Sequence, residues 1–176
     1  MEKVEIVPYN EADRAEYIEM FVEYGNWLDS QVLNHYGVHQ FQISVRETIE
    51  RLVPQFTSIK PPEGDILFLK VDGIIACMAR FDKFDDGIGF VHNVWTNPNY
   101  RRRGYASQLM SFVEDKAREY GYRFLRLDHG GFNVPAHRMY ENLGYKKIDR
   151  FTDFDRIEND PRAKYYLDKV YMEKKL

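Results

Sequence analysis

The stretch that decides the fold is "NPNYRRRGYASQLM", residues 97–110, in which turn residues and three consecutive arginines precede a helical pattern. From Gly104 onward, apolar residues recur with a period near 3.6, at Ala106, Leu109, Met110, Val113, Ala117 and Tyr120. The pattern predicts a helix that closes at Gly121. A helix start carries unpaired N–H groups and the positive end of the macrodipole, so adjacent arginines indicate that an anion docks there.

The segments on either side of this helix read as strands. "IGFVHNVWT", residues 88–96, is rich in β-branched and aromatic residues, and "FLRLDH", residues 124–129, follows the helix. A strand, a helix and a second strand predict a right-handed parallel crossover. The carboxyl ends of both strands would then meet at one edge of the sheet, where open α/β sheets bind ligands.

The rest of the chain supplies further elements of a mixed α/β fold. We expect two helices, one opened by Asn10 and running to about Leu28 and one opened by Ser44 with Glu47 in capping-box spacing. Strands are expected at residues 4–9, at 66–81 as a hairpin around a "DG" turn, at 145–149 and in the final segment 163–176, with a short helix at 134–144. The acidic run "FDKFDDG" reads as another hairpin turn, and its local field could also attract a cationic amine. No repeat or linker divides the chain, so residues 1–176 are expected to form one domain.

Composition excludes several classes of protein. A chain of 176 residues with 44% hydrophobic residues can bury one core, and its net charge of −3 disfavours a general nucleic-acid binder. Cys77 is the only cysteine, so no intramolecular disulfide forms, which fits a reducing compartment. No signal-peptide pattern and no membrane-length apolar run occurs, and we expect a cytoplasmic protein without membrane contact.

The sequence around the arginines matches one anion-binding pattern and lacks two others. Neither the Walker pattern G-x-x-x-x-G-K-[ST] nor the dinucleotide pattern G-x-G-x-x-G is present. Residues 101–106 fit [RQ]-x-x-G-x-[GA] between a strand and a helix. Gly104 permits close backbone approach and Ala106 leaves room above the first turn, so successive amides there can form a concave nest for a diphosphate.

A second pattern lies about thirty residues downstream, and it consists of Asn133, Ala136, Tyr140 and the pair Gly144–Tyr145. In this order and on these elements, the two patterns resemble the GNAT superfamily of acyl-CoA-dependent N-acyltransferases. The element order resembles that family over essentially the whole chain. The resemblance implies a mixed, mostly antiparallel sheet with one parallel crossover and helices on both faces. It also implies direct transfer of an acetyl group from acetyl-CoA to an amine, without a covalent enzyme intermediate and without a metal.

The resemblance assigns roles to individual residues. Backbone amides from Arg102 to Ala106 would hold the pyrophosphate of coenzyme A, Asn133 would contact the pantetheine arm, and Tyr140 would protonate the departing thiolate. The cofactor-binding set that follows is Val94, Trp95, Thr96, Arg101, Arg102, Arg103, Gly104, Tyr105, Ala106, Asn133, Ala136 and Tyr140. Each role has a structural competitor, since Asn133 could be only a helix cap, Tyr140 could only pack in the core, and arginine runs are usually solvated.

The sequence leaves the general base open. His92 is the first candidate, because it lies two residues and hence one same-face step from Val94, and imidazole titrates near neutral pH. Asp128 and His129 end the neighbouring strand and could act through water. No glutamate occupies residues 88–96, so a direct carboxylate base from that strand is not expected.

Two other classes of function are kept beside the enzyme. A non-catalytic acyl-CoA sensor or interaction module would bind the coenzyme without turnover, and a nucleic-acid binder would use Arg101 to Arg103 with a steep salt dependence. The expected partner is a small-molecule or peptide amine, with no nucleic acid, and a homodimer paired through the C-terminal segment is left open. His35 and His39 have metal-ligand spacing without a third ligand, and we interpret them as loop residues.

Overall fold

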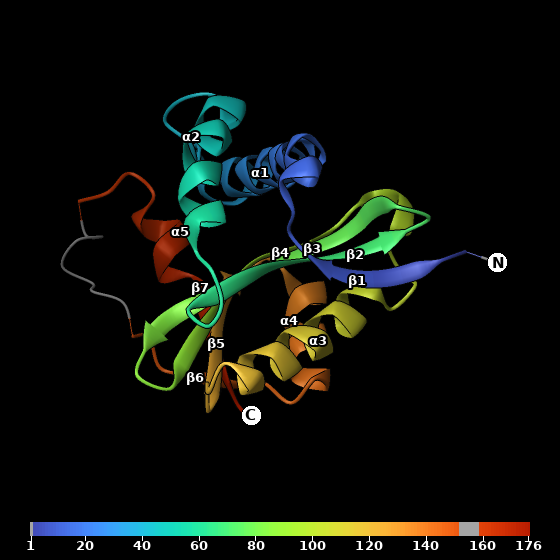
Figure 1. Ribbon diagram of the computed structural model, residues 1–176. Helices are drawn as coiled ribbons and strands as arrows, with labels where there is room; N and C mark the ends of the chain where they lie inside the picture. Colours follow the sequence, from blue (N-terminus) through green and yellow to red (C-terminus); the bar gives the residue numbers. More distant parts are fainter. Residues whose placement is uncertain (1, 152–158) are drawn as a thin grey trace.

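The computed structural model describes residues 2–151 and 159–176 (Figure 1). Within these residues seven strands form one sheet in the order β1-β2-β3-β4-β5-β7-β6. Only the β4–β5 pair is parallel. The strands are β1 (Val4–Pro8), β2 (Gly64–Val71), β3 (Ile74–Asp85), β4 (Ile88–Thr96), β5 (Phe124–Gly130), β6 (Lys146–Ile148) and β7 (Lys169–Lys175).

Helices cover both faces of this sheet (Figure 1). On one face lie α1 (Arg14–Tyr36) and α2 (Val45–Ser58), and on the other lie α3 (Tyr105–Glu119) and α4 (Val134–Asn142). Shorter helical segments are η1 (Glu11–Asp13), η2 (Pro98–Tyr100) and α5 (Ala163–Leu167). The mostly antiparallel mixed sheet and the parallel crossover through α3 are confirmed.

The sheet separates two hydrophobic cores. On β2, Leu67 and Leu69 join the core under α3, while Ile66 and Phe68 join the core under α1 and α2. Successive side chains of a strand point to opposite faces, so a strand buried on both sides is apolar at every position. This explains the unbroken run "ILFL" in the middle of the sheet.

Short-range sequence signals predicted most element boundaries correctly. Asn10 accepts a hydrogen bond from the amide of Ala12, and Ser44 accepts one from the amide of Glu47 at 3.2 Å. Asp72 and Gly73 form the turn between β2 and β3 with positive φ angles of 50° and 84°. These are capping and turn interactions between residues close in sequence, which a local pattern can identify.

Two predicted boundaries were wrong. The first helix continues past Leu28 to Tyr36 and ends at Gly37, whose φ is 75°, so His35 lies in its last turn and not in a loop. The final segment is not strand throughout, because residues 163–167 form α5. Tyr165 of α5 is buried and its ring lies 5.7 Å from the Tyr36 ring. This long-range packing on α1 outweighs the strand propensity of the segment.

The carboxyl ends of β4 and β5 do not pair with each other. Their parallel pairing runs from Ile88↔Phe124 to Val91↔Leu127, although β4 continues to Thr96 and β5 to Gly130. An extra residue in β4 shifts the register against β3 between Met78↔Trp95 and Arg80↔His92. Asn93 lies in this bulge with a φ of 54°. The expectation of regular alternation from His92 to Val94 is therefore wrong, because a bulge re-aims the side chains around it.

A buried leucine of the crossover tests this description of the core. Leu127→Ala is expected to lower the free energy of unfolding by about 2–5 kcal/mol, because Leu127 is 1% exposed and its loss leaves a cavity. Urea denaturation measures the change. Leu167→Ala is the matched control, since Leu167 is 46% exposed, and it should change the free energy by less than about 0.5 kcal/mol. Equal losses in the two variants would contradict the assignment of the core.

Candidate functional site

Two cavities open where β4 and β5 separate. The first, called the α3 cavity, has a volume of about 650 Å³ and lies between the end of β4, the start of α3 and α4. Eleven of the twelve residues predicted to bind the cofactor line it, and they are Val94, Trp95, Thr96, Arg101, Arg102, Gly104, Tyr105, Ala106, Asn133, Ala136 and Tyr140. The remaining one, Arg103, does not line this cavity.

The loop before α3 is shaped to present backbone N–H groups. Arg102 and Gly104 have positive φ angles of 62° and 78°, and a Cβ built on Gly104 would meet nothing within 4 Å. Gly104 is the N-cap of α3 and supplies no side-chain hydrogen bond. No acceptor among the described residues takes the amide hydrogens of residues 102–107. Unpaired amides at a helix N-terminus form an anion site, so the residues present fit a diphosphate.

The three arginines have different surroundings. The Arg101 guanidinium lies 4.5 Å from the Trp95 ring centroid, and its Nε donates to the Thr96 carbonyl at 3.1 Å. Arg103 pairs with Glu2 at 3.0 Å, away from the α3 cavity. Arg102 is exposed, and no described residue pairs with its guanidinium. Arg101 and Arg102 have no carboxylate partner among the described residues, and the guanidinium of Arg102 has no hydrogen-bond partner there either.

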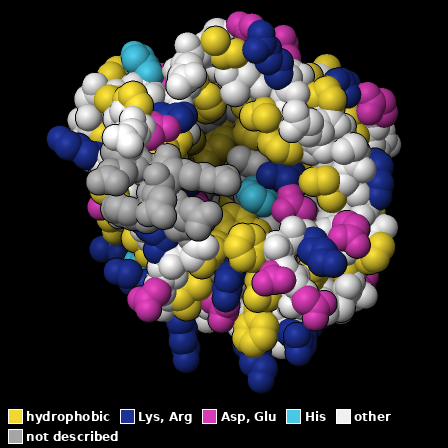
Figure 2. Space-filling view, turned by 90° about the vertical axis from the view of Figure 1, so that its left-hand side faces the viewer, with side chains coloured by type: hydrophobic (Ala, Val, Ile, Leu, Met, Phe, Trp, Pro, Cys, Tyr) yellow, Lys and Arg dark blue, Asp and Glu magenta, His cyan; other side chains and the backbone are white. Residues whose placement is uncertain are grey.

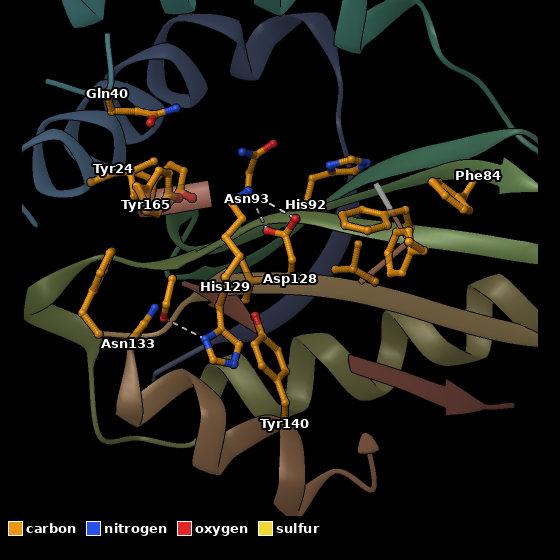
Figure 3. Close-up of a pocket in the computed structure, with 18 residues that line it drawn as sticks. Tyr24, Gln40, Phe84, His92, Asn93, Asp128, His129, Asn133, Tyr140 and Tyr165 are labelled. Carbon is orange, nitrogen blue, oxygen red and sulfur yellow. Dashed lines mark hydrogen bonds and ion pairs between the residues drawn. The ribbon is translucent and has the colours of Figure 1, made fainter. Parts of the chain in front are cut away.

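Helix α4 places two predicted residues between the cavities. The Asn133 side chain accepts from the amide of Ala136, so Asn133 does cap the helix. Tyr140, two turns later, is 5% exposed and lines both cavities. Its hydroxyl points from α4 toward the sheet (Figure 3). Burial raises the pKa of Tyr140 well above 10, and neighbouring groups, led by Tyr24, raise it further.

The second cavity, called the His92 cavity, has a volume of about 440 Å³. It meets the α3 cavity at four shared lining residues, Val94, Phe132, Asn133 and Tyr140. Figure 2 shows a hollow lined largely by hydrophobic side chains, with a histidine at its edge and charged side chains beside it. His92, Asn93 and Val94 all line the cavity, although they are consecutive in β4. The bulge thus brings both faces of the strand to one space.

His92 is held by a buried pair on β3. Its Nε2 lies 3.1 Å from Oδ1 of Asp82, whose other oxygen pairs with the 7%-exposed Arg80. A carboxylate only accepts, so Nε2 carries the proton and Nδ1 keeps its lone pair. No described residue forms a hydrogen bond with Nδ1. Burial lowers the pKa of His92, while the hydrogen bond to Asp82 opposes that shift, so the ring is neutral at pH 7.

The other two proposed bases are already engaged. Asp128 accepts both bonds of an ion pair with Lys169, at 3.0 and 3.2 Å (Figure 3). His129 is 8% exposed, its Nδ1 lies 2.9 Å from the Gly130 carbonyl, and its Nε2 lies 3.0 Å from His137. Both ring nitrogens of His129 are therefore occupied. Of the three residues, His92 is the one with a free acceptor nitrogen.

Sequence reasoning missed the residues that support this site. Asp82 lies in the acidic run "FDKFDDG", which was not expected to support a histidine, and Lys169 lies in the final strand. Trp95 donates through Nε1 to Glu23 of α1 at 2.8 Å. A cross-strand signal existed for Arg80, which faces His92 in the β3–β4 register, but it becomes visible only when the bulge is known.

In the described part of the chain, no group of three or more His, Cys, Asp or Glu residues is placed to bind a metal ion. None of its helices has the length and apolar character that crossing a membrane requires.

Comparison with known proteins gives consistent matches. Residues 26–145 match the model of the Acetyltransferase (GNAT) family. The chain is 28% identical over 125 residues to "Uncharacterized N-acetyltransferase YsnE" of Bacillus subtilis, covering 70% of this chain and 72% of that protein. It is 23% identical over 152 residues to "Aminoglycoside N(6')-acetyltransferase type 1" of Acinetobacter haemolyticus, covering 86% of this chain and 97% of that protein. The structure of yncA, a putative acetyltransferase from Salmonella typhimurium with its cofactor acetyl-CoA, aligns with a TM-score of 0.68 at 17% identity. The alignment covers 99% of this chain and 94% of that chain.

The protonation state of His92 gives a direct test of the site. In an NMR pH titration, the His92 ring is expected to titrate below the ordinary value of about 6.5, because burial disfavours the charged form. Asp82→Asn should lower this pKa further, since the carboxylate that favours the imidazolium is gone. A His92 pKa at or above 6.5 in the unmodified protein, or an upward shift in Asp82→Asn, would be inconsistent with this geometry.

Proposed function

The chain belongs to the GNAT family of acetyl-CoA-dependent N-acetyltransferases, and we propose that it acetylates a primary amine held in the His92 cavity while acetyl-CoA occupies the α3 cavity. The observation that carries this arrangement is that the two cavities meet at Val94, Asn133 and Tyr140. Two substrates, one in each cavity, would have their reactive groups brought together there. Holding both in one geometry is a large part of catalysis of a bimolecular step.

The α3 cavity has the donors that the coenzyme requires. The unpaired amides of residues 102–107 would hold the pyrophosphate, and the Arg102 guanidinium would add a charge-assisted contact. The end of β4 and Asn133 would bind the pantetheine arm. Bound acetyl-CoA supplies an acetyl thioester that an amine can attack directly. In this assignment Arg103 forms its ion pair with Glu2 and does not contact the coenzyme.

Two side chains would transfer protons, one by accepting a proton from the ammonium and the other by donating one to the departing sulfur. His92 has a free Nδ1 facing no described partner and is neutral at pH 7, so it can take a proton from the incoming ammonium, directly or through water. Tyr140 stays protonated because burial raises its pKa, so its phenol can donate to the departing sulfur. Asp128, fixed by Lys169, would orient the amine and not act as the base. The backbone amide of Val94, turned by the bulge, is the proposed donor to the carbonyl oxygen.

In this proposal, residues 1–176 form one catalytic domain. The enzyme acts in the cytoplasm on a small-molecule or peptide amine. Catalysis requires no metal, since the thioester is already activated and the proton carriers are side chains. The N-acetyltransferase relatives support turnover over a sensor that only binds the coenzyme.

Removal of the Tyr140 hydroxyl separates chemistry from binding. Tyr140→Phe is expected to lower kcat by about 10²–10³-fold, in the range of a lost general acid, with acetyl-CoA affinity within twofold. Thiol release and calorimetry measure the two quantities. Tyr145→Phe is the matched control, because Tyr145 is 2% exposed, lies 5.8 Å from Tyr140 and lines neither cavity. The proposal fails if both variants keep full kcat.

The two ends of α3 test the phosphate site. Gly104 and Gly121 both have positive φ angles, 78° and 90°, and a Cβ at either meets nothing within 4 Å. Gly104→Val and Gly121→Val should therefore destabilise the fold to a similar degree. Only Gly104→Val is expected to weaken acetyl-CoA binding, by at least about tenfold, because its side chain enters the space where the amides meet the anion. If calorimetry gives the same acetyl-CoA affinity for Gly104→Val and Gly121→Val, this loop is not the phosphate site.

A further inference from the structure

The wall of the His92 cavity beside the histidine is built of phenylalanine rings. Phe84 and Phe90 lie 5.9 Å apart, and Phe151 lies 5.0 Å from Phe84 and 5.9 Å from Phe90, measured between ring centroids. We call these three residues the Phe wall. The Phe90 ring is 4.6 Å from the His92 ring, so the apolar surface begins next to the proposed base. Phe84 is 43% exposed, so part of this apolar surface is open to solvent.

The Phe wall continues into other aromatic residues across the cavity. Tyr24 of α1, Phe132 of the β5–α4 loop and Tyr165 of α5 also line the cavity. The Phe132 and Tyr165 rings stack with centroids 6.2 Å apart. Figure 3 shows Phe84 at one end of the cavity and Tyr24 and Tyr165 at the other, with His92 and Asp128 between them. An occupant whose amine lies near His92 would therefore have aromatic surface within reach.

The polar groups between these rings are suited to one ammonium. The side-chain oxygens of Asn93 and Gln40 are buried and accept no hydrogen bond from a described residue. Asn93 and Gln40 line the cavity with Asp128 (Figure 3). A buried oxygen without a donor is costly, and the N–H groups of a bound amine would satisfy it.

The charges of the described lining are balanced before any substrate binds. Asp128 is paired with Lys169, and Asp82 behind His92 is paired with Arg80. Burial lowers the pKa of both His92 and His129, so neither adds a charge at neutral pH. A polyamine or an aminoglycoside would bring several ammonium groups, whereas the described lining offers one carboxylate, Asp128, which Lys169 already shares. Buried charges without partners are strongly disfavoured.

From this lining we infer that the acceptor is a small primary amine with a single positive charge and one aromatic group, of the arylalkylamine type. The inference rests on the proposed function and names the substrate class of its acceptor site. The ammonium lies among Asn93, Asp128 and His92, and the ring lies against the Phe wall. A volume of about 440 Å³ accommodates a molecule of this size and not a folded peptide segment. The neutral amine nitrogen attacks the thioester carbon and the C–S bond breaks. Of the two protons that the ammonium loses, one passes to His92, and the other replaces the proton that Tyr140 gives to the departing thiolate.

A panel of matched amines tests the inference in the full-length protein. Phenethylamine, ethylamine, spermidine, kanamycin and a tetrapeptide with an N-terminal phenylalanine are compared by the rate of thiol release from acetyl-CoA. The value of kcat/KM for phenethylamine is expected to exceed those of ethylamine, spermidine and kanamycin by at least about tenfold. A higher value for spermidine or kanamycin overturns the single-charge assignment, and a higher value for the tetrapeptide overturns the small-molecule assignment.

Variants of the Phe wall show whether these rings cause the preference. Phe90→Ala and Phe84→Ala are each expected to lower the phenethylamine-to-ethylamine ratio of kcat/KM at least about fivefold. Phe112→Ala is the control, because Phe112 lies on α3 outside both cavities, and it should leave the ratio unchanged. An unchanged ratio in both wall variants overturns the inference.

Binding separates failure of this inference from failure of the proposed function. Phenethylamine is expected to shift the NMR signals of the His92 ring in the unmodified protein, with at least about tenfold weaker binding in Phe90→Ala. If another amine is acetylated and phenethylamine neither binds nor reacts, the inference is wrong and the function stands. If acetyl-CoA binds and no amine of the panel reacts, the proposed function is overturned, and the inference with it.

Discussion

The site depends on one constraint, the end of hydrogen-bonded pairing between β4 and β5 after Val91↔Leu127. Beyond this pair the two strands continue with separate partners, β4 against β3 and β5 against β7. A gap inside a sheet opens to both faces, whereas a pocket on a helix opens to one. The α3 cavity and the His92 cavity both open into this gap and share Val94 and Tyr140. Reaction between two separately bound molecules needs this geometry.

The helix termini show where the fold leaves bonding capacity unused. The side chains of Ser44 and Asn133 accept from backbone amides at the starts of α2 and α4. No side chain does so at the starts of α1, α3 and α5, and of these three starts only that of α3 has left-handed residues, Arg102 and Gly104. Unpaired amides in solvent cost little, and they become strong donors when an anion excludes water from them. The missing cap of α3 is consistent with a binding function and has no evident benefit for folding.

The sequence predicted features that depend on neighbouring residues, and it failed where distant segments meet. The crossover, the loop with Gly104 and the position of Tyr140 on α4 follow from local periodicity and turn chemistry. The bulge at Asn93 does not, because it is a mismatch in length between β3 and β4 that neither segment encodes alone. Asp82 supports His92 from ten residues away through this register, and α5 exists because Tyr165 packs on Tyr36 of α1.

Burial sets the protonation states of both the proposed base, His92, and the proposed acid, Tyr140. Desolvation disfavours a charge of either sign, so it lowers the pKa of His92 and raises that of Tyr140. Both side chains are neutral at pH 7, one with a free lone pair and one with an available proton. Ion pairs fix the remaining charges, Asp82 with Arg80 and Asp128 with Lys169. An electrically balanced site favours the loss of the ammonium charge on binding, and a neutral amine is the form that attacks a thioester.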